Sequence, residues 1–278
     1  MPSLLRRFYR LSLLLMLATI GILIELLIFP MITPNARRRI IRQWSRALLR
    51  ACGLRLRVAR PEDAAAAGAP AASAPREHLA PGRMLVSNHV SWLDIFAIDA
   101  LAPASFVAKA ELRRWPVAGW LAAMAGTVFI ERGRRHAVHQ VIGQLRGRIR
   151  NGYPVALFPE ATTSPGLTVL PFHANLLEAA IEEDAEIVPI VLRYLDAAGL
   201  PAAQAAYVGE TTFLQSLWMV LGASGLVVTV RVLRLVPSRG HNRHELANEL
   251  SGLISAALAS RTPGSAPETA DAFRAASR

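Results

Sequence analysis

The sequence predicts an α/β protein with a largely parallel β-sheet flanked by helices, preceded by an N-terminal hydrophobic membrane-anchoring helix and an amphipathic basic helix. The first observation is that short apolar runs alternate with helical patterns over residues 84–260, as expected for parallel strands joined by helical crossovers. The second is a long apolar run at residues 11–32. The third is charge: the first sixty residues hold twelve arginines and one carboxylate, Glu25, so the whole formal net charge of +11 lies there.

The apolar run LSLLLMLATIGILIELLIFPMI predicts a retained membrane anchor. As a helix, it can cross a hydrocarbon core of roughly 30 Å. Pro30 and an arginine cluster follow the run, whereas a cleaved signal peptide would end in small residues. The excess of arginine after the run predicts that its C-terminal side faces the cytoplasm. Glu25 and Pro30 leave open a helix that enters only one leaflet.

A second N-terminal helix is expected at residues 36–50, ARRRIIRQWSRALLR. One face carries apolar side chains and another carries arginines: Ile40, Ile41, Trp44 and Leu48 against Arg38, Arg42, Arg46 and Arg50. This pattern is typical of a helix lying in a membrane interface, and equally of an amphipathic helix packed on a domain. The neighbouring apolar run favours the first interpretation. The single cysteine, Cys52, excludes an internal disulfide and is expected to be a buried thiol.

The rest of the chain divides by composition. We expect an anchor and basic helix at 1–60, an Ala/Pro-rich linker at 61–83, an α/β domain at 84–260 and an unstructured tail at 261–278. Strands are predicted at 84–88, 105–109, 126–130, 154–158, 186–194, 205–209 and 226–236. Helices are predicted after His89 and at 115–124, 136–151, 172–184 and 243–260.

The stretch VSNHVSWLDI, residues 86–95, places a histidine and an aspartate five positions apart directly after a predicted strand. The carboxyl end of a strand is where α/β sheets place catalytic groups. We expect Ser91 to cap the following helix, whose first turn carries Asp94 beside His89. A carboxylate there fixes the imidazole tautomer and raises the basicity of the other ring nitrogen. The pair supplies a base and its orienting group, so the hydroxyl it deprotonates is expected to arrive with a substrate.

Four further residues are candidates for binding. Arg132 ends the predicted strand in GTVFIER, where a guanidinium can bind phosphate through two hydrogen bonds. Glu160 and Thr162 lie in ALFPEATTS, where a strand runs into a turn rich in hydroxyls that could hold a polar head group. Lys109 is the only lysine of the chain, which hints at a role that arginine does not fill. Each is also consistent with an ordinary strand end or turn.

The motifs NHVSWLD, KAEL, GTVFIER, FPEATTS and IVPIV occur together in an order that resembles the glycerolipid acyltransferase family, nearest to bacterial 1-acylglycerol-3-phosphate acyltransferases. The resemblance covers residues 84–191. It implies transfer of a fatty acyl group from acyl-CoA or acyl carrier protein to a lysolipid hydroxyl, at a bacterial inner membrane. It also implies that His89 is the general base, that Asp94 orients it, and that Arg132 and Glu160 help bind the acceptor, the arginine at its phosphate. No metal or other cofactor is expected.

Two positions depart from the family pattern. Ala161 stands where glycine usually follows the motif glutamate, so a turn that needs a positive φ would strain it. His173 stands where a basic residue commonly follows Pro-Phe, and a neutral imidazole holds a phosphate less firmly. Both departures bear on which lipid is the acceptor.

Three alternatives remain at this point. The acceptor can be another lysolipid, such as lyso-ornithine lipid, because FPEATTS and VLPF also resemble the bacterial enzymes that acylate it. A catalytically silent membrane-binding protein is disfavoured by the intact pair of His89 and Asp94. A nucleic-acid binder is disfavoured because the arginines flank an apolar run and the remaining chain is neutral. We therefore expect a bilayer, a lysolipid and an acyl donor as partners, and no nucleic acid.

Overall fold

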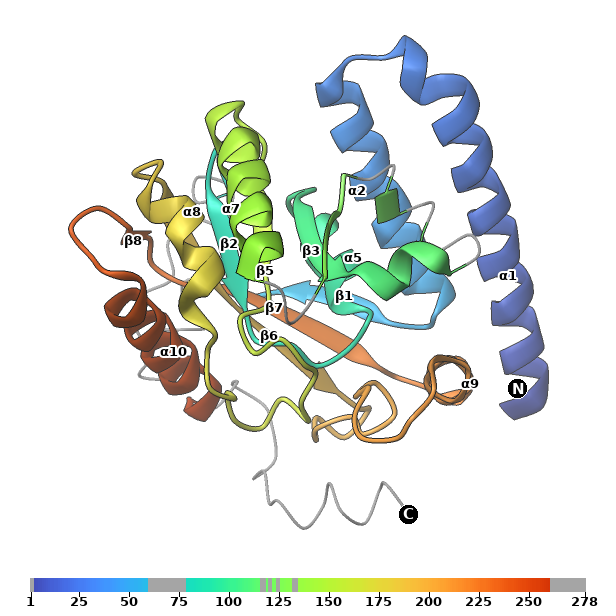
Figure 1. The fold of residues 1–278 in the computed structure, drawn as a ribbon. Helices are drawn as coiled ribbons and strands as arrows, with labels where there is room; N and C mark the ends of the chain where they lie inside the picture. The colour runs from blue at the N-terminus through green and yellow to red at the C-terminus, as the bar shows by residue number, and fades with distance from the viewer. Residues whose placement is uncertain are drawn as a thin grey trace.

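A mixed β-sheet forms the centre of the structure (Figure 1). The structure is a computed structural model, and it describes residues 3–59, 79–115, 119, 122–123, 126–131 and 135–260. The strands are β1 (Arg55–Val58), β2 (Met84–Ser87), β3 (Ser105–Lys109), β4 (Val128–Ile130), β5 (Val155–Leu157), β6 (Glu186–Leu195), β7 (Val227–Val232) and β8 (Val236–Pro237). Their order is β1-β7-β6-β2-β5-β3-β4, with β8 paired to β6. Strands β6, β2, β5, β3 and β4 run parallel, whereas β7 and β8 are antiparallel to β6. The predicted, largely parallel sheet is confirmed.

Helices cover both faces of this sheet because its central strands are apolar on both sides. In β2, Met84 and Val86 pack into one buried cluster, and Leu85 packs into the other. Successive side chains of a strand point to opposite faces, so a continuous apolar run needs cover on each face. The helices on the Leu85 side are α2 (Pro34–Ala51) and α5 (Asp94–Asp99). Those on the other side are α7 (Arg135–Arg150), α8 (Glu178–Ile181) and α10 (Arg243–Ala259).

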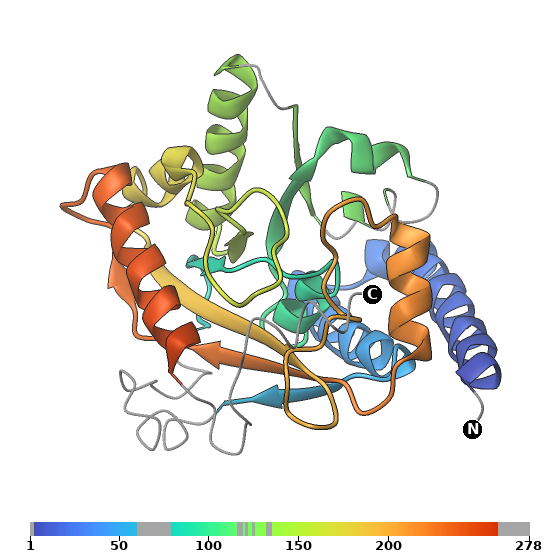
Figure 2. The ribbon, with the colours of Figure 1, turned by 90° about the horizontal axis from the view of Figure 1, so that it is seen from below.

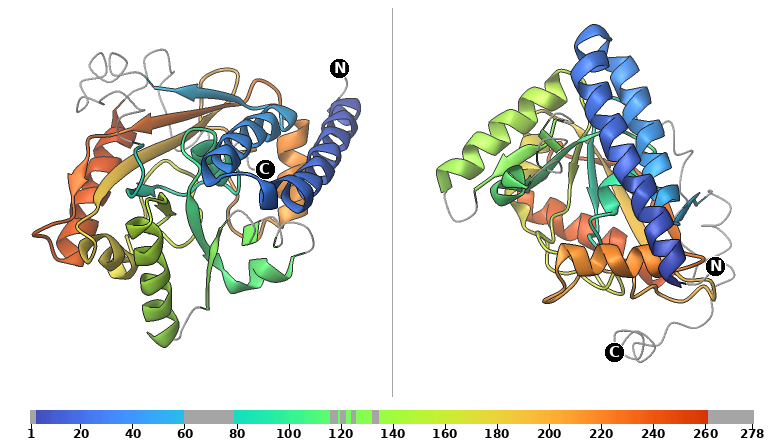
Figure 3. Two further views of the ribbon diagram at one scale, coloured as in Figure 1. Left: turned by 90° about the horizontal axis from the view of Figure 1, so that it is seen from above. Right: turned by 90° about the vertical axis from the view of Figure 1, so that its right-hand side faces the viewer.

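The N-terminal segment is a pair of antiparallel helices that lies along the outside of the domain (Figures 1 and 3). Helix α1 (Ser3–Leu23) continues through a π-helical turn (Ile24–Ile28) and a 3-10 turn (Phe29–Met31) before α2 returns. The continuous helical segment Ser3–Met31 is long and apolar enough to span a membrane. Of its most apolar stretch of 18 residues, 11% is buried against the rest of the structure. The Trp44 indole donates to the Leu17 carbonyl at 3.1 Å and joins the two helices.

Helix α2 packs on the domain through its C-terminal half. Leu48 and Leu49 are buried among side chains of the sheet, and the Trp44 ring meets Phe96 of α5 edge to face at 5.8 Å. Arg46 Nε donates to the Ala100 carbonyl at 3.0 Å, at the end of α5. The domain-packed interpretation of this amphipathic helix is therefore the one that the structure shows. Cys52, which follows α2, is fully buried, and its burial raises the thiol pKa to about 12.

The structure differs from the sequence prediction at several elements. Strand β1 pairs with β7, so the sheet begins inside the segment assigned to the anchor. Helix α9 (Phe213–Gly222) was not predicted; it begins at a capping box between Thr212 and Gln215. The strand expected at 205–209 is wrong: this segment is irregular, between a turn that ends at Ala205 and another that begins at Gly209, and the Ala205 amide donates to the Ala202 carbonyl at 3.0 Å. Most of 115–124, most of the linker and the tail from 261 lie outside the described residues.

Candidate active site

Three neighbouring strands bring the candidate residues to one edge of the sheet. Strands β6, β2 and β5 are adjacent and parallel, so their carboxyl ends coincide. His89 follows the end of β2, Glu160 follows the end of β5, and Tyr194 lies near the end of β6. Because this edge is where parallel sheets place ligands, the topology assembles a site from segments that are far apart in the sequence.

His89 and Asp94 form the predicted pair. His89 Nδ1 lies 2.8 Å from Asp94 Oδ2, and the backbone amides of Val90 and Ser91 donate to the same oxygen at 2.7 and 2.9 Å. Because a carboxylate oxygen accepts, Nδ1 carries the hydrogen of the neutral ring and Nε2 is left with its lone pair. The geometry therefore prepares Nε2 of His89 to take a proton.

Ser91 does not cap the helix, contrary to the prediction. Helix α5 begins at Asp94, its N-cap residue is Leu93, and no side chain caps it. The Asp94 side chain instead reaches back to the backbone amides in front of the helix. The hydroxyl of Ser91 is buried and has no hydrogen-bond partner among the described residues. Reaching back fixes the loop of residues 89–93 around the carboxylate.

Tyr194 is a site residue that the sequence analysis missed. Its hydroxyl donates to Asp94 Oδ1 at 2.7 Å, and both side chains are buried. Burial and the adjacent carboxylate raise the pKa of the Tyr194 phenol well above its ordinary value, so it remains a hydrogen-bond donor. The carboxylate of Asp94 thus accepts four hydrogen bonds, which offset the cost of placing it away from water.

The imidazole of His89 also has a fixed plane. It stacks on the ring of Phe158, with centroids 4.1 Å apart and an interplanar angle of 12°, and its side chain remains 20% exposed. Phe158 in turn stacks on Phe106 of β3 at 6.0 Å. An imidazole that is held on one edge and on one face, and that keeps some exposure to solvent, can meet a hydroxyl group with little rearrangement.

Glu160 holds the backbone of His89. The residue is 3% exposed, and Oε1 accepts from the amide of His89 at 2.9 Å while Oε2 accepts from the amide of Leu170 at 3.1 Å. Burial raises the pKa of Glu160, and the backbone hydrogen bonds oppose that rise. Ser164 donates its amide to the His89 carbonyl at 2.8 Å. The loop after β5 therefore fixes both peptide groups of His89.

The turn after β5 contains the first of the two departures. Ala161 has φ of 56°, in the left-handed region, and its amide donates to the Phe158 carbonyl at 3.0 Å. Of the two possibilities left open by the sequence, a strained alanine or a different turn, the structure shows the strained alanine, and a residue with a Cβ costs roughly 1–2 kcal/mol there. His173 lies at the far end of the same loop with an exposed side chain, and its amide donates to the Pro159 carbonyl at 2.9 Å.

The remaining predicted binding residues are either exposed or outside the described residues. Thr162 follows the strained turn and has an exposed side chain. Lys109 ends β3, the strand beyond β5, and is also exposed. Arg132 lies outside the described residues. His89, Asp94 and Glu160 are thus brought into one connected group, whereas the roles of Lys109, Thr162 and Arg132 in binding stay predictions.

Two more residues that the sequence analysis passed over support the site. Asn88 is fully buried and joins β2 to β6: its Nδ2 donates to the Leu192 carbonyl at 3.0 Å, and its Oδ1 accepts from the Leu192 amide at 2.9 Å. The Trp92 indole donates to Ser216 Oγ of α9 at 3.2 Å. A polar residue directly at the end of an apolar strand was the available signal for Asn88. None existed for Tyr194, a hundred positions from its partner.

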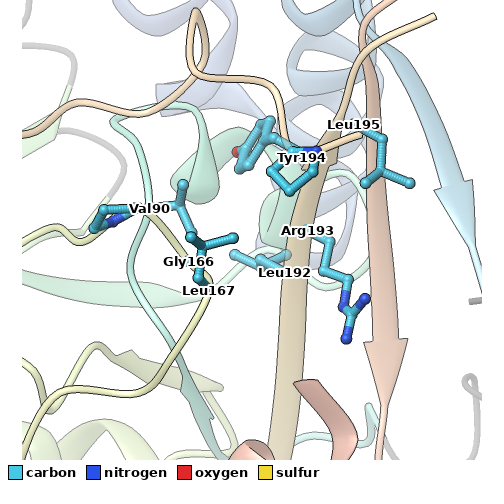
Figure 4. Close-up of a pocket in the computed structure, with 9 residues that line it drawn as sticks. Val90, Gly166, Leu167, Leu192, Arg193, Tyr194 and Leu195 are labelled. Atoms are coloured by element: carbon cyan, nitrogen blue, oxygen red, sulfur yellow. The ribbon is translucent and has the colours of Figure 1, made fainter. Parts of the chain in front are cut away.

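A pocket adjoins the residues that hold Asp94. Val90, Gly166, Leu192 and Tyr194 contribute to its lining, and Figure 4 shows them converging from β6 and from two loops. Its side chains are mostly apolar, with Arg193 as the charged exception. Within the described part of the chain, no group of three or more His, Cys, Asp or Glu side chains could hold a metal ion.

Comparison with known proteins agrees with this geometry. A family model described as acyltransferase matches residues 72–193. The lyso-ornithine lipid O-acyltransferase of Pseudomonas aeruginosa is 36% identical, over 82% of this chain and 81% of that protein. The 1-acyl-sn-glycerol-3-phosphate acyltransferase of Neisseria meningitidis serogroup B is 35% identical, over 81% and 83%. The crystal structure of the lysophosphatidic acid acyltransferase PlsC from Thermotoga maritima shares the fold, with a TM-score of 0.63, 20% identity and coverage of 92% and 94%. The chain belongs to the acyltransferase family.

Proposed function

We propose that this protein transfers a fatty acyl group from a thioester of coenzyme A or acyl carrier protein to the hydroxyl of a lysolipid, with 1-acylglycerol-3-phosphate as acceptor and phosphatidic acid as product. The observation that carries the proposal is the pair of His89 and Asp94, whose 2.8 Å contact leaves Nε2 of a partly exposed imidazole as a base. The family supports the reaction type, and relatives that acylate lysolipids support the acceptor class.

In the proposed reaction, Nε2 of His89 takes the proton of the acceptor hydroxyl as its oxygen attacks the thioester carbonyl. The tetrahedral intermediate collapses with loss of the thiolate, and the proton held by His89 passes to that sulfur. Asp94 stabilises the imidazolium between these steps and prevents the ring from turning. The products are an ester and a free thiol, so no metal or further cofactor enters the proposed reaction.

Replacing the base tests this mechanism. We expect His89→Ala to abolish acyl transfer from labelled acyl-CoA or acyl carrier protein in isolated membranes, with an unchanged amount of protein. His139→Ala, which removes an exposed histidine of α7, is the matched control and should retain wild-type turnover. Normal activity of His89→Ala would remove the base from the mechanism and leave the acyltransferase assignment without its catalytic residue.

A second candidate acceptor is lyso-ornithine lipid. It is supported by the relative from Pseudomonas aeruginosa, whose identity to this chain is as high as that of the relative from Neisseria meningitidis. Ala161 and His173 are the family departures that bear on the acceptor. A panel of lysolipids with one labelled donor separates the candidates. Preference for the phosphate-bearing lipid supports phosphatidic acid synthesis and the role of Arg132, whereas equal or faster turnover of lyso-ornithine lipid favours the alternative.

The protein is proposed to work at the cytoplasmic face of a bacterial inner membrane, with α1 buried in one leaflet. This proposal rests on the exposed apolar face of α1 and on its first arginines. Arg6 Nε donates to the Gly222 carbonyl at 3.0 Å, and Arg10 Nη1 donates to the carbonyls of Leu221 and Ala223 at 3.0 and 2.6 Å. These contacts tie the beginning of α1 to the same domain that α2 packs on, so both ends stay on one side. A C-terminal reporter that is active only in the periplasm should stay silent.

A further inference from the structure

Helix α9 is short and uncharged, and it presents large apolar side chains to the outside of the domain. Its sequence is FLQSLWMVLG, and Leu214 is 74% and Trp218 38% exposed. Buried side chains of the same helix, among them Ser216 and Val220, fix the opposite face on the domain. Isolated exposed leucines are ordinary on protein surfaces, so the question is whether these side chains continue a larger apolar surface.

They do, because α9 lies beside the N-terminal half of α1 (Figures 2 and 3). The ring of Trp218 meets Phe8 of α1 edge to face at 5.9 Å, and the guanidinium of Arg7 lies 4.9 Å above the same ring. Phe8 is itself 61% exposed, and other apolar side chains of α1 are exposed as well, among them Leu4, Leu5 and Leu15. The outer surface of α9 is thus continuous with that of the long apolar helix.

Arginine contacts also join α9 to α1. The carbonyls at the C-terminal end of α9 accept from Arg6 and Arg10, where a cation also meets the negative end of the helix dipole. Wherever α1 lies, α9 therefore lies beside it at a fixed orientation. A helix that enters a leaflet would bring Leu214 and Trp218 to the same boundary, and tryptophan is favoured at that boundary because its ring is apolar and its indole nitrogen is polar.

Helix α9 also contacts the loop that carries the base. Phe213 at its start meets Trp92 at 5.3 Å and Trp115 at 5.4 Å, edge to face in both contacts, and the Trp92 indole donates to Ser216 at 3.2 Å. Trp92 lies between His89 and Asp94 in the sequence, and Trp115 is 40% exposed. The apolar surface therefore extends from α1 across α9 to the border of the candidate active site.

We propose that α9 is a second membrane-contacting element, and that Leu214 and Trp218 enter the same leaflet as α1, so that the bilayer surface borders the loop of His89. The occupant is a lipid bilayer and not a protein, because the surface is continuous with the apolar face of α1 and is flanked by the arginine-rich arm, which suits anionic lipids. This inference rests on the membrane location given under the proposed function, and it adds a membrane contact beside the N-terminal half of α1.

Depth-dependent quenching tests it. The full chain in a Cys52→Ala background receives one cysteine, by Leu214→Cys on α9, Met31→Cys at the exposed corner before α2, or Asn248→Cys at an exposed position of α10. Each variant is labelled with a small fluorophore and mixed with vesicles of phosphatidylethanolamine and phosphatidylglycerol that contain lipids brominated along the acyl chain. We expect strong quenching at positions 214 and 31 and none at 248, with acyl transfer measured in the same samples.

The outcomes are distinguishable. Quenching at 31 but not at 214 overturns the role of α9 and leaves both acyl transfer and the membrane contact of α1 intact. Absence of quenching at both positions, in samples that still transfer acyl groups, overturns the membrane location as well. Loss of acyl transfer in all samples bears on the proposed function and not on α9.

A charge substitution supplies the second readout. Because Leu214 is exposed, Leu214→Asp leaves the packing of the domain unchanged, and it should lower the vesicle partition coefficient about tenfold while acyl transfer to lysolipid in detergent micelles stays normal. Asn248→Asp, the matched control on α10, should leave partitioning unchanged. If Leu214→Asp instead converts a dimer into a monomer in sedimentation and leaves partitioning unchanged, the face is a contact between two copies and the proposal fails.

Discussion

Replacing Glu160 with glutamine separates two roles for this carboxylate. Its two oxygens accept from the amides of His89 and Leu170, and it is buried. Glutamine keeps one accepting oxygen, but its amide nitrogen faces a backbone N–H, so one donor loses its acceptor. A hydrogen bond to a charged group contributes about 1.5–3 kcal/mol, and we expect Glu160→Gln to lower the free energy of unfolding by about that amount.

The effect on catalysis follows from the same contacts. A backbone that is no longer fixed at His89 misplaces Nε2, and a displacement of about 1 Å can cost about a hundredfold in rate. We therefore expect kcat to fall by about that factor, with the KM for the lysolipid within about twofold of wild type. A glutamate that bound the acceptor directly would give the reverse pattern, with a raised KM and a nearly unchanged kcat.

The assay is steady-state acyl transfer in detergent micelles, with the urea unfolding curve of each variant measured alongside. Glu210→Gln removes an exposed carboxylate and is the matched control, which should be unchanged in both measurements. Because burial raises the pKa of Glu160, acidification protonates it earlier than an exposed glutamate, and the wild-type rate should fall toward that of Glu160→Gln as the pH is lowered. A raised KM with normal kcat and normal stability would refute the positioning role.

Three further predictions concern single side chains. Tyr194→Phe leaves Asp94 Oδ1 without its phenol donor, so we expect the free energy of unfolding to fall by about 1.5–3 kcal/mol. We also expect a lower kcat at unchanged KM. An unchanged kcat would exclude a role for Tyr194 in positioning Asp94. Ala161→Gly removes roughly 1–2 kcal/mol of left-handed strain but stabilises the unfolded chain by about 0.4–1 kcal/mol through added conformational freedom. Urea unfolding should therefore show a gain in stability of up to about 1.6 kcal/mol, and a clear loss would contradict this reasoning. Burial raises the pKa of Asp99 from 3.8 to about 8, so between these pH values the folded state keeps a proton that the unfolded chain has released. The free energy of unfolding should therefore fall as the pH rises from about 4 to about 8. Thermal melts should show this pH dependence in the wild type and not in Asp99→Asn.

The parts that sequence predicted are those determined by local pattern. The strands of the parallel sheet are short runs of buried apolar residues, and His89 and Asp94 are close because five positions span one strand end and the first turn of a helix. Helix α9 was not predicted because its ten residues are apolar on almost all sides, so its apolar residues show no helical period of 3.6. Strand β1 was not predicted because its sequence, RLRV, is too short to distinguish from a loop.

Contacts across the sheet are a different case. Tyr194 reaches Asp94 only because β6 lies next to β2, and Glu160 reaches the His89 backbone only because β5 lies on the other side of β2. The spacing of these residues along the chain predicts neither contact. The family resemblance pointed to Glu160 as a site residue, yet its hydrogen bonds to two backbone amides follow from the pairing of strands and not from the motif.

The arginine contacts between α1 and α9 set an order of events during synthesis. Arg6 and Arg10 lie 216 and 211 positions before the carbonyls of Gly222 and Leu221 that they contact. At about 5–20 residues per second, α1 leaves the ribosome about 10–40 s before its partner exists. Throughout that interval a strongly apolar, basic helix lacks the α9 contacts that hold it on the domain. At the proposed membrane location, the nascent chain would therefore reach the bilayer first, and the domain would fold against a helix that is already among lipids.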